Sequence, residues 1–348
     1  MMRRLAGLAW TMVLAGCLSS PSTTPADGGG DAVVMPGVDG GGSRDARTTS
    51  GDVGTTRDAG GGPETATGQD ATAIVEGGRA ADGGASRCAM TSTAVTCPSQ
   101  QHTESTASGA RVVYYQVPLG AAPAAGWPVV INFQATDVGP TYAFVASTSD
   151  AYAAFGIYYE AELTKNLLDA GYAVLAPEAI TTDGTSFWET NISPYATSWS
   201  GSPDDELVQK MLTDIAAGVF GPLDESSLYA TGLSSGGYMT SRMALSYPGK
   251  FKALAIESAS WATCLSGGGP SGSGMCTVPS TLPAMHPPTL LLHGTLDTTI
   301  IPEWTVTAYV TALTASGVPE KEVDDANGGH QWIPEAPSAV LAWFQKYP

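Results

Sequence analysis

Short apolar segments alternate with segments of helical length over most of the chain after residue 110. The apolar runs cover residues 128–133, 172–177, 251–256 and 289–292, and they resemble strands that are buried on both faces. A further strand is predicted at 112–117, and the segments that fit helices are 158–170, 204–220, 238–247, 304–316 and 336–347. Strands and helices that alternate at these lengths predict an α/β fold with a mostly parallel sheet covered on both faces.

A glycine-serine turn, Gly232-Leu233-Ser234-Ser235-Gly236, separates a predicted strand at 228–231 from the helix at 238–247. A sharp strand-to-helix turn crowds the backbone, so its flanking positions require glycine, and it raises the central hydroxyl at the carboxyl edge of the sheet. Negative charge that develops there is favoured by the helix N-terminus. Ser234 is central, because Ser235 would need a glycine at position 233. We predict Ser234 as a nucleophile; the alternative is a turn without chemistry.

A serine hydroxyl needs a neighbouring base, and His330 fits that role best. It follows Asn327-Gly328-Gly329 in a loop after the last predicted strand. In serine hydrolases with parallel sheets the order along the chain is serine, acid, histidine, and Asp297 supplies the acid at the end of a buried strand. Its predicted role is to hold the imidazole tautomer and stabilise the imidazolium. The residues that fit less well are Asp324 and Asp325, expected in solvent, His102, expected before the sheet, and His286 and His293.

The segment from residue 18 to 87 contains no Phe, Tyr or Trp, and 17 of its 70 residues are glycine. Such a segment cannot bury enough apolar surface to offset the entropy of ordering it, so we expect a disordered tether. The formal net charge of −18 argues against a nucleic-acid partner and against electrostatic adhesion to anionic lipid. The predicted catalytic domain is therefore residues 88–348.

Residues 1–16 predict a signal peptide, with Arg3 and Arg4 before an apolar centre. The sequence Leu14-Ala15-Gly16-Cys17 resembles a bacterial lipobox, which implies that Cys17 is acylated and becomes the new N-terminus. The alternative is an ordinary secretory signal. The resemblance implies export and lipid anchoring at the outer membrane or cell surface, or release from the cell. Contact with the membrane is expected only through this N-terminal anchor.

Four cysteines remain after Cys17, and export implies an oxidising compartment in which an even number usually pairs. They are Cys88, Cys97, Cys264 and Cys276, and three connectivities are open. We predict Cys88–Cys97 and Cys264–Cys276, because each pair is close in sequence and brackets a loop. The chain has no CxxC motif and no histidine spaced with these cysteines, so we expect no metal site and no cofactor.

Three sequences resemble the secreted poly(3-hydroxybutyrate) depolymerase-like esterases of the α/β-hydrolase fold: Thr231–Met239, His293-Gly294-Thr295-Leu296-Asp297 and Gly328-Gly329-His330-Gln331-Trp332. The resemblance covers residues 110–348. It implies a serine esterase that forms an acyl-enzyme on a polyester. Feruloyl and acetyl-xylan esterases belong to the same branch, so an esterified polysaccharide is the alternative substrate.

Members of this family often carry His-Gly after the third strand, where this chain has Asn132-Phe133-Gln134-Ala135-Thr136. We assign the oxyanion donors to the backbone N–H of Ser235 and to that of Gln134 or Ala135. The aromatic residues Trp261, Trp188 and Trp199 are predicted to contact substrate, with a core position as the alternative for Trp261. The last two lie in a long segment, 181–203, expected to form a lid or rim.

Two other functions remain open from the sequence. The chain could be a surface-binding protein that keeps a hydrolase scaffold without catalysis, and the altered strand after Asn132 favours this reading mildly. It could also be a serine peptidase, although no acidic motif is visible that would anchor a peptide amino terminus. The predicted Ser234, Asp297 and His330 argue against the binding protein, and the lack of an anchor motif argues against the peptidase.

Overall fold

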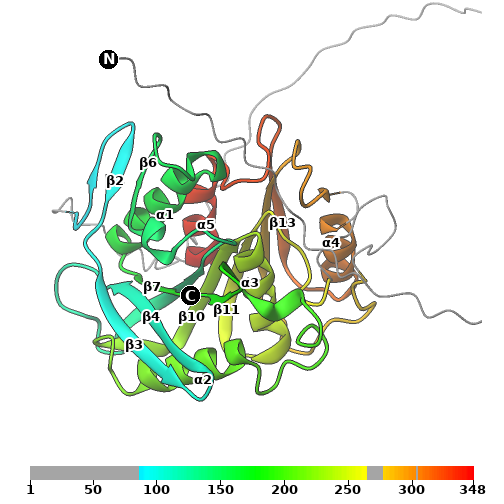
Figure 1. The fold of residues 1–348 in the computed structure, drawn as a ribbon, viewed down its shortest axis with the longest axis horizontal. Coiled ribbons are helices and arrows are strands. Elements are labelled where there is room, and N and C mark those ends of the chain that lie inside the picture. Colours follow the sequence, from blue (N-terminus) through cyan, green and yellow to red (C-terminus); the bar gives the residue numbers. More distant parts are fainter. Residues whose placement is uncertain (1–85, 265–276, 303–304) are drawn as a thin grey trace, which may run out of the picture. The chain divides into compact units, whose positions relative to one another are not determined.

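The computed structural model describes residues 86–264, 277–302 and 305–348. Within these ranges, eight strands form the central sheet in the order β13-β12-β11-β10-β5-β7-β4-β3 (Figure 1). Their bounds are β3 Gln100–Thr106, β4 Gly109–Gln116, β5 Trp127–Phe133, β7 Ala173–Pro177, β10 Leu223–Leu233, β11 Phe251–Glu257, β12 Thr289–Gly294 and β13 Glu320–Asp325.

The six strands β5, β7 and β10 to β13 run parallel to one another within the described part of the sheet. Strand β4 pairs antiparallel with β7, and β3 pairs antiparallel with β4. A parallel pair needs a crossover connection, and helices lie in the described connections from β5 to β7, β7 to β10, β10 to β11 and β12 to β13. This arrangement confirms the predicted α/β-hydrolase fold, with its mostly parallel sheet.

Helices cover both faces of the sheet (Figure 1). One apolar cluster joins the sheet to α1 (Ile157–Asp169) and α5 (Ala336–Lys346). On the opposite face, two clusters join it to α2 (Pro203–Ala216), α3 (Ser235–Ser246) and α4 (Val306–Ala315). Strands β5, β10 and β11 lie between these layers and are almost wholly buried near their carboxyl ends, which explains their continuous apolar runs.

Several short elements depart from the sequence prediction. A small sheet contains β1 (Ala89–Met90), β2 (Ala94–Thr96) and β6 (Val145–Ser147), and β8 (Ile180–Thr182) pairs with β9 (Thr185–Phe187) inside the expected irregular segment. Short 3₁₀ helices in the described ranges include η1 (Pro140–Ala143), η2 (Ala153–Phe155) and η3 (Glu189–Asn191). The expectation that His102 precedes the sheet is wrong, because it lies on β3. That strand was missed because it is a mostly polar edge strand without an apolar run.

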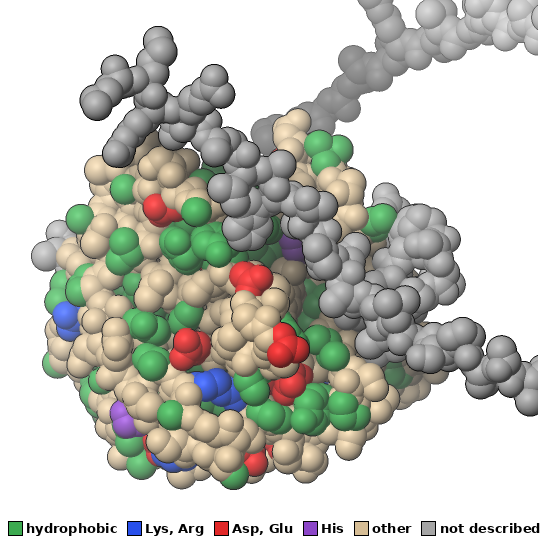
Figure 2. Space-filling view, in the orientation of Figure 1, with side chains coloured by type: hydrophobic (Ala, Val, Ile, Leu, Met, Phe, Trp, Pro, Cys, Tyr) green, Lys and Arg blue, Asp and Glu red, His purple; other side chains and the backbone are tan. Residues whose placement is uncertain are grey.

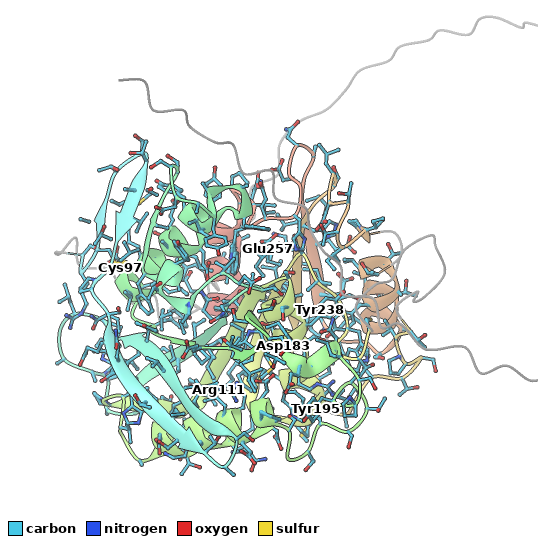
Figure 3. All side chains as sticks on the ribbon, viewed as in Figure 1. Cys97, Arg111, Asp183, Tyr195, Tyr238 and Glu257 are labelled. Carbon is cyan, nitrogen blue, oxygen red and sulfur yellow. A yellow bond between two sulfur atoms is a disulfide. The ribbon has the colours of Figure 1, made fainter. Side chains whose placement is uncertain are left out.

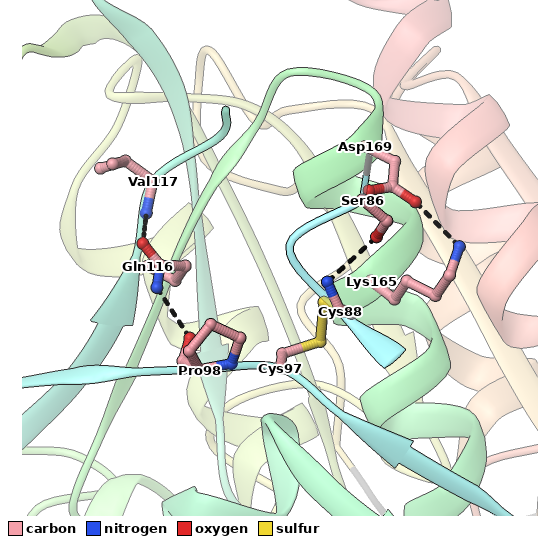
Figure 4. The surroundings of a disulfide bond; sticks show 8 residues. All are labelled: Ser86, Cys88, Cys97, Pro98, Gln116, Val117, Lys165 and Asp169. Atoms are coloured by element: carbon pink, nitrogen blue, oxygen red, sulfur yellow. Dashed lines mark hydrogen bonds and ion pairs between the residues drawn. A yellow bond between two sulfur atoms is a disulfide. The ribbon is translucent and has the colours of Figure 1, made fainter. Parts of the chain in front are cut away.

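The disulfide Cys88–Cys97 closes the β1–β2 hairpin, as predicted (Figure 4). The Cys97 N–H donates to the Phe144 carbonyl at 2.8 Å, and β2 pairs with β6. Both sulfurs lie in the apolar cluster that contains α1. The crosslink therefore fixes the start of the described chain against that helix layer.

The other calls on the N-terminal segment and on the second cysteine pair fall outside the described ranges. These are the leader at 1–16, Cys17, most of the tether, and Cys276. Cys264 is disulfide-bonded, but its predicted pairing with Cys276 stays a prediction. The elements described above belong to one structural unit, Val75–Pro348. None of the described helices has the length and hydropathy needed to cross a bilayer.

We expect the double variant Cys88→Ala/Cys97→Ala to lower the free energy of unfolding by about 2–3 kcal/mol, because the crosslink restricts the unfolded chain. Urea titration at neutral pH measures this change. Esterase activity at 25 °C should stay within twofold of wild type, since the hairpin supplies no residue of the candidate site. An unchanged urea midpoint would show that strand pairing alone holds this hairpin.

Candidate active site

Ser234 occupies a strained turn between β10 and α3. Its backbone has φ 56° and ψ −118°, a positive φ that costs a non-glycine residue on the order of 1–3 kcal/mol. The Ser234 N–H donates to the Glu257 carbonyl at 3.0 Å, and its own carbonyl accepts from Tyr238 N–H at 3.0 Å as α3 begins. The hydroxyl thus stands at the carboxyl edge of the sheet and at a helix N-terminus, in the context that the sequence motif requires.

Gly236 is required by crowding rather than by its own backbone angles. A Cβ built at this position would lie 1.9 Å from the Phe133 carbonyl oxygen and 2.6 Å from the Gln134 carbonyl oxygen. The end of β5 therefore presses directly on the first turn of α3. This contact brings the segment after β5 beside Ser234 and Ser235.

The Ser235 side chain has a structural task that separates it from Ser234. Its hydroxyl accepts the Trp188 backbone N–H at 2.9 Å and is buried. Ser234 is partly exposed, and its hydroxyl forms no hydrogen bond within the described residues. Of the two adjacent serines, Ser234 is the one free to attack a substrate.

Asp297 and His330 are hydrogen-bonded at the same edge of the sheet. Asp297 follows β12, and its Oδ2 lies 2.8 Å from His330 Nδ1. Its Oδ1 accepts the N–H groups of Thr299 and Ile300 at 2.8 and 2.9 Å. The carboxyl is fully buried, whereas the His330 side chain keeps 14% of its surface exposed. The carboxylate is therefore held on both oxygens, and the ring retains access to solvent.

The pKa of Asp297 is lowered in spite of burial. Burial alone raises its pKa, but hydrogen bonds and the charge interaction with His330, together with the two backbone N–H groups, lower it below the ordinary value. An ionised carboxylate only accepts hydrogen bonds, so Nδ1 of His330 carries a proton. The Nε2 lone pair of the neutral ring is then available as a base.

Backbone contacts place the His330 loop next to the serine turn. The Glu257 carbonyl holds Ser234 N–H, and the next residue, Ser258, donates its N–H to Leu292 and its hydroxyl to the Gln331 carbonyl at 3.4 Å. Burial raises the pKa of Tyr238, which lies on the first turn of α3 (Figure 3), and the charge of Asp297 raises it further. The Asp297 carboxylate is therefore close enough to this turn to act on it. The Ser234 hydroxyl and the His330 ring are not hydrogen-bonded; in free enzymes this contact commonly tightens when substrate binds.

Comparison with known proteins identifies the family. No family profile matches the chain. A poly(3-hydroxyoctanoate) depolymerase from Pseudomonas fluorescens is 45% identical over 240 residues, which cover 69% of this chain and 81% of that protein. The chain belongs to this depolymerase family. It is a hydrolase of the serine esterase type.

Solved structures with lower identity were also found. An acetyl xylan esterase from Aspergillus awamori is 19% identical with a TM-score of 0.49, and the match covers 71% of this chain and 99% of that one. A carboxylesterase from Bacillus cereus is 12% identical with a TM-score of 0.44, covering 68% and 95%.

The predicted oxyanion segment of this depolymerase-family chain is fixed by the β8–β9 hairpin. Gln134 Nε2 donates to Ser186 Oγ at 3.2 Å, and Gln134 Oε1 accepts Ala179 N–H at 3.2 Å. The Gln134 carbonyl accepts the Trp188 indole N–H at 2.9 Å. The glutamine that replaces the family's usual His-Gly therefore anchors the segment on three atoms. The backbone donors Ser235, Gln134 and Ala135 stay predictions.

The structure corrects the predicted substrate contacts of the three tryptophans. Trp188 and Trp261 are 0% and 1% exposed, so their rings cannot touch a bound substrate. Trp188 instead supports the oxyanion segment, and Trp261 stacks on His286 in the core, as its alternative reading stated. Trp199 is also buried, beneath Arg242, in a groove at the far end of α3 from Ser234. The position of these tryptophans in the sequence suggested that they line the rim of the site, but their packing buries them.

The remaining histidines and acids have structural partners. His286 hydrogen-bonds Tyr309, and His293 lies 3.1 Å from Asp324 on β13. Two clusters in the described ranges have ligand atoms close enough for a metal ion: His102 with Glu104 and Asp214, and His293 with Glu322 and Asp324. The Lys210 ammonium already pairs with the first cluster, and the two acids of the second are exposed. Neither cluster includes Ser234, Asp297 or His330.

Sequence reasoning missed two buried acids behind the triad. Glu160 on α1 accepts the Asn132 amide at 2.9 Å, and burial raises its pKa to about 7 although hydrogen bonds from Asn132 and Trp332 lower it. Burial raises the pKa of Glu257 well above its ordinary value, more than the facing Ile333 N–H lowers it (Figure 3). Trp332 and Ile333 closely follow His330. The two acids therefore link the His330 loop to β5 and β11. For Glu257 the sequence did hold a signal, because a single acid directly follows the apolar run 251–256.

We expect Asp297→Asn to lower kcat for p-nitrophenyl butyrate by about 10³–10⁴-fold, because an amide does not enforce the Nδ1–H tautomer or stabilise the imidazolium. Steady-state kinetics at pH 8 measure the loss. Asp324→Asn is the matched control, since Asp324 pairs with His293, and it should retain activity within twofold. If kcat falls strongly in the Asp324 variant and not in the Asp297 variant, the acid that orients the histidine is Asp324 on β13.

Glu160 should make the fold less stable as pH rises. Its folded pKa of about 7 exceeds its ordinary 4.5, so the folded state binds the proton more tightly and stability falls between those two values. The expected loss is about 3 kcal/mol, by the energy of a pKa shift. Glu160→Gln should remove that loss, as measured by urea unfolding at pH 5 and pH 8. Glu225→Gln, at an exposed position, should leave the change in the free energy of unfolding between pH 5 and pH 8 as it is in wild type. If the free energy of unfolding changes equally between pH 5 and pH 8 in wild type and in Glu160→Gln, this account is contradicted.

Proposed function

We propose that this chain hydrolyses the ester bonds of a poly(3-hydroxyalkanoate) with medium-length side chains. The observation that carries the proposal is the hydrogen-bonded Asp297–His330 pair beside the strained Ser234 turn, in a chain 45% identical to a depolymerase of poly(3-hydroxyoctanoate). Ser234 is the proposed nucleophile, His330 the general base and acid, and Asp297 the residue that orients the ring.

Acylation begins when Ser234 Oγ attacks the ester carbonyl carbon and its proton passes to His330 Nε2. The carbonyl electron pair moves to oxygen, and the proposed donors for that oxyanion are the N–H of Ser235 and that of Gln134 or Ala135. Each such donor is worth about 3–4 kcal/mol in the transition state. When the tetrahedral intermediate collapses, the bond to the alkoxy oxygen breaks and His330 returns its proton to that oxygen.

Deacylation repeats these steps with water as the nucleophile. His330 takes a proton from water, the hydroxide attacks the acyl-enzyme, and Ser234 leaves with the proton returned by His330. The products are a carboxylic acid and an alcohol, so one water is consumed for each ester bond. Asp297 stays ionised throughout, consistent with the lowered pKa of its carboxyl.

The proposed place of action is outside the cytoplasm. The sequence of residues 1–17 supports export and acylation of Cys17, and the glycine-rich segment that follows supports a tether. A polymer too large to enter a cell must be cut where an exported enzyme meets it. Export therefore suits this substrate class, although it suits other surface esterases equally well.

Ser234→Ala should abolish hydrolysis of p-nitrophenyl butyrate and of poly(3-hydroxyoctanoate) latex, with a loss of at least about 10⁴-fold in kcat. Ser246→Ala, at the other end of α3, should keep wild-type rates and circular dichroism. A fluorophosphonate should label wild type and Ser246→Ala but not Ser234→Ala. Retained activity in Ser234→Ala would reject the nucleophile.

The substrate class is tested on the wild-type enzyme with poly(3-hydroxyoctanoate), poly(3-hydroxybutyrate), acetylated xylan and methyl ferulate in parallel. Release of 3-hydroxyoctanoate units, measured by liquid chromatography, should exceed release from the other three. Faster deacetylation of xylan would assign the enzyme to carbohydrate esters. Labelling by fluorophosphonate with no turnover of any ester would favour a binding protein on this scaffold.

A further inference from the structure

A row of aromatic rings leads from the surface to the candidate general base. Phe155 contacts the His330 ring edge-on, with 6.4 Å between centroids. Tyr152 follows at 6.3 Å from Phe155, and Tyr142 at 5.4 Å from Tyr152. All three rings are partly exposed and also pack on the apolar cluster under α1. We call these three residues, Tyr142, Tyr152 and Phe155, the aromatic row.

The backbone fixes the aromatic row against the His330 loop. The Phe155 carbonyl accepts the Trp332 N–H at 3.0 Å. The next residue, Gly156, has φ +67°, and a Cβ there would lie 2.2 Å from the Trp332 carbonyl oxygen. This close approach leaves no room for relative sliding of η2 and the loop. The contact between Phe155 and His330 is therefore a built feature and not a chance position of one side chain.

Hydrophobic side chains gather on the α1 side of the molecule (Figure 2), and the rings of the row pack on the apolar cluster that contains α1. Partly exposed aromatic rings that form a continuous row offer apolar area to a ligand at little cost in side-chain entropy. Among the described residues, the Lys and Arg groups that lie over aromatic rings are at Trp199, Trp343 and Tyr347, and none lies over a ring of this row. An alkyl chain, which needs apolar area and no hydrogen bonds, suits such a surface.

The position of the row selects one side of the ester. His330 must protonate the leaving alkoxy oxygen, so the group attached to that oxygen lies against the His330 ring. In a poly(3-hydroxyalkanoate) this group is the next hydroxyacyl unit, and the carbon that bears the oxygen also bears the alkyl side chain. Phe155 packs edge-on against that same ring, so the aromatic row begins beside the proposed general acid.

We propose that the aromatic row is a subsite for the alkyl side chain of the hydroxyacyl unit on the leaving-alcohol side of the scissile ester. The proposal rests on the proposed function, because it takes His330 as the general acid. It assigns to Tyr142, Tyr152 and Phe155 a role in selecting medium-length side chains. Burial of each methylene of the alkyl chain is expected to raise kcat/KM by about two- to fourfold.

Two substrate series separate the two sides of the ester. The n-alkyl acetates from ethyl to octyl vary the alcohol, and p-nitrophenyl esters from butyrate to octanoate vary the acyl group. In wild type, kcat/KM should rise with chain length in the alcohol series. Tyr152→Ala and Phe155→Ala should flatten that rise to less than 1.5-fold per methylene and leave the slope of the acyl series unchanged.

Further variants guard against indirect effects on His330. Tyr142→Ala and Tyr152→Ala remove rings that do not touch His330, so their effect on the alcohol series reports the subsite itself. Phe155→Leu should restore most of the slope that Phe155→Ala loses, because it restores apolar area. Tyr115→Ala, on β4 and packed against Phe220, is the aromatic control and should behave as wild type.

The outcomes distinguish this proposal from the proposed function. If wild type hydrolyses no ester and is not labelled by a fluorophosphonate, the proposed function is overturned. Normal turnover with an alcohol-series slope that no row variant changes would overturn the subsite alone. A change confined to the acyl series would also overturn it, because the row would then hold the other half of the ester.

Discussion

The backbone of Ser234 is the constraint on which the rest of the site depends. A positive φ at a serine is unfavourable, and it persists because neighbours on three sides determine it. Strand β11 holds the Ser234 N–H through the Glu257 carbonyl, the end of β5 presses on Gly236, and α3 begins at once on the other side. The same crowding brings β5 and its following segment within reach of the serine. One strained residue therefore fixes both the attacking oxygen and its surroundings.

The acids around this turn differ in charge because they differ in hydrogen bonding. Asp297 receives donors on both oxygens, so burial does not prevent its ionisation and its pKa is lowered. Glu257 is equally enclosed but faces a single backbone N–H, and its pKa is raised well above the ordinary value. Charge is thus concentrated where it faces the imidazole. Burial raises the pKa of Glu257 and of Glu160, which disfavours negative charge on these two acids behind the site.

The sequence predicted those parts of the fold and the site that rest on local rules. The buried strands, their helices and the Ser234 turn follow from apolar runs, periodicity and two glycines, and the Asp297–His330 pair follows from positions after strands. Burial of an aromatic side chain has no such local rule. Trp188 and Trp261 lie in segments that look like rims, yet tertiary contacts with Phe133, His286 and Tyr309 enclose them. Strand β3 was missed for a related reason, since its pairing with β4 and not its composition makes it a strand.

The correction of the tryptophans changes how substrate selection has to be understood. Large rings buried under the site can only shape its backbone, as Trp188 does through the Gln134 carbonyl. Selection must then come from side chains that remain partly exposed. Tyr142, Tyr152 and Phe155 meet that condition, and Phe155 packs against the His330 ring. In the proposed mechanism His330 protonates the leaving oxygen, so an apolar surface joined to its ring faces the alcohol half of the ester. The proposed subsite therefore separates alcohol-chain preference from acyl-chain preference and assigns only the former to the aromatic row.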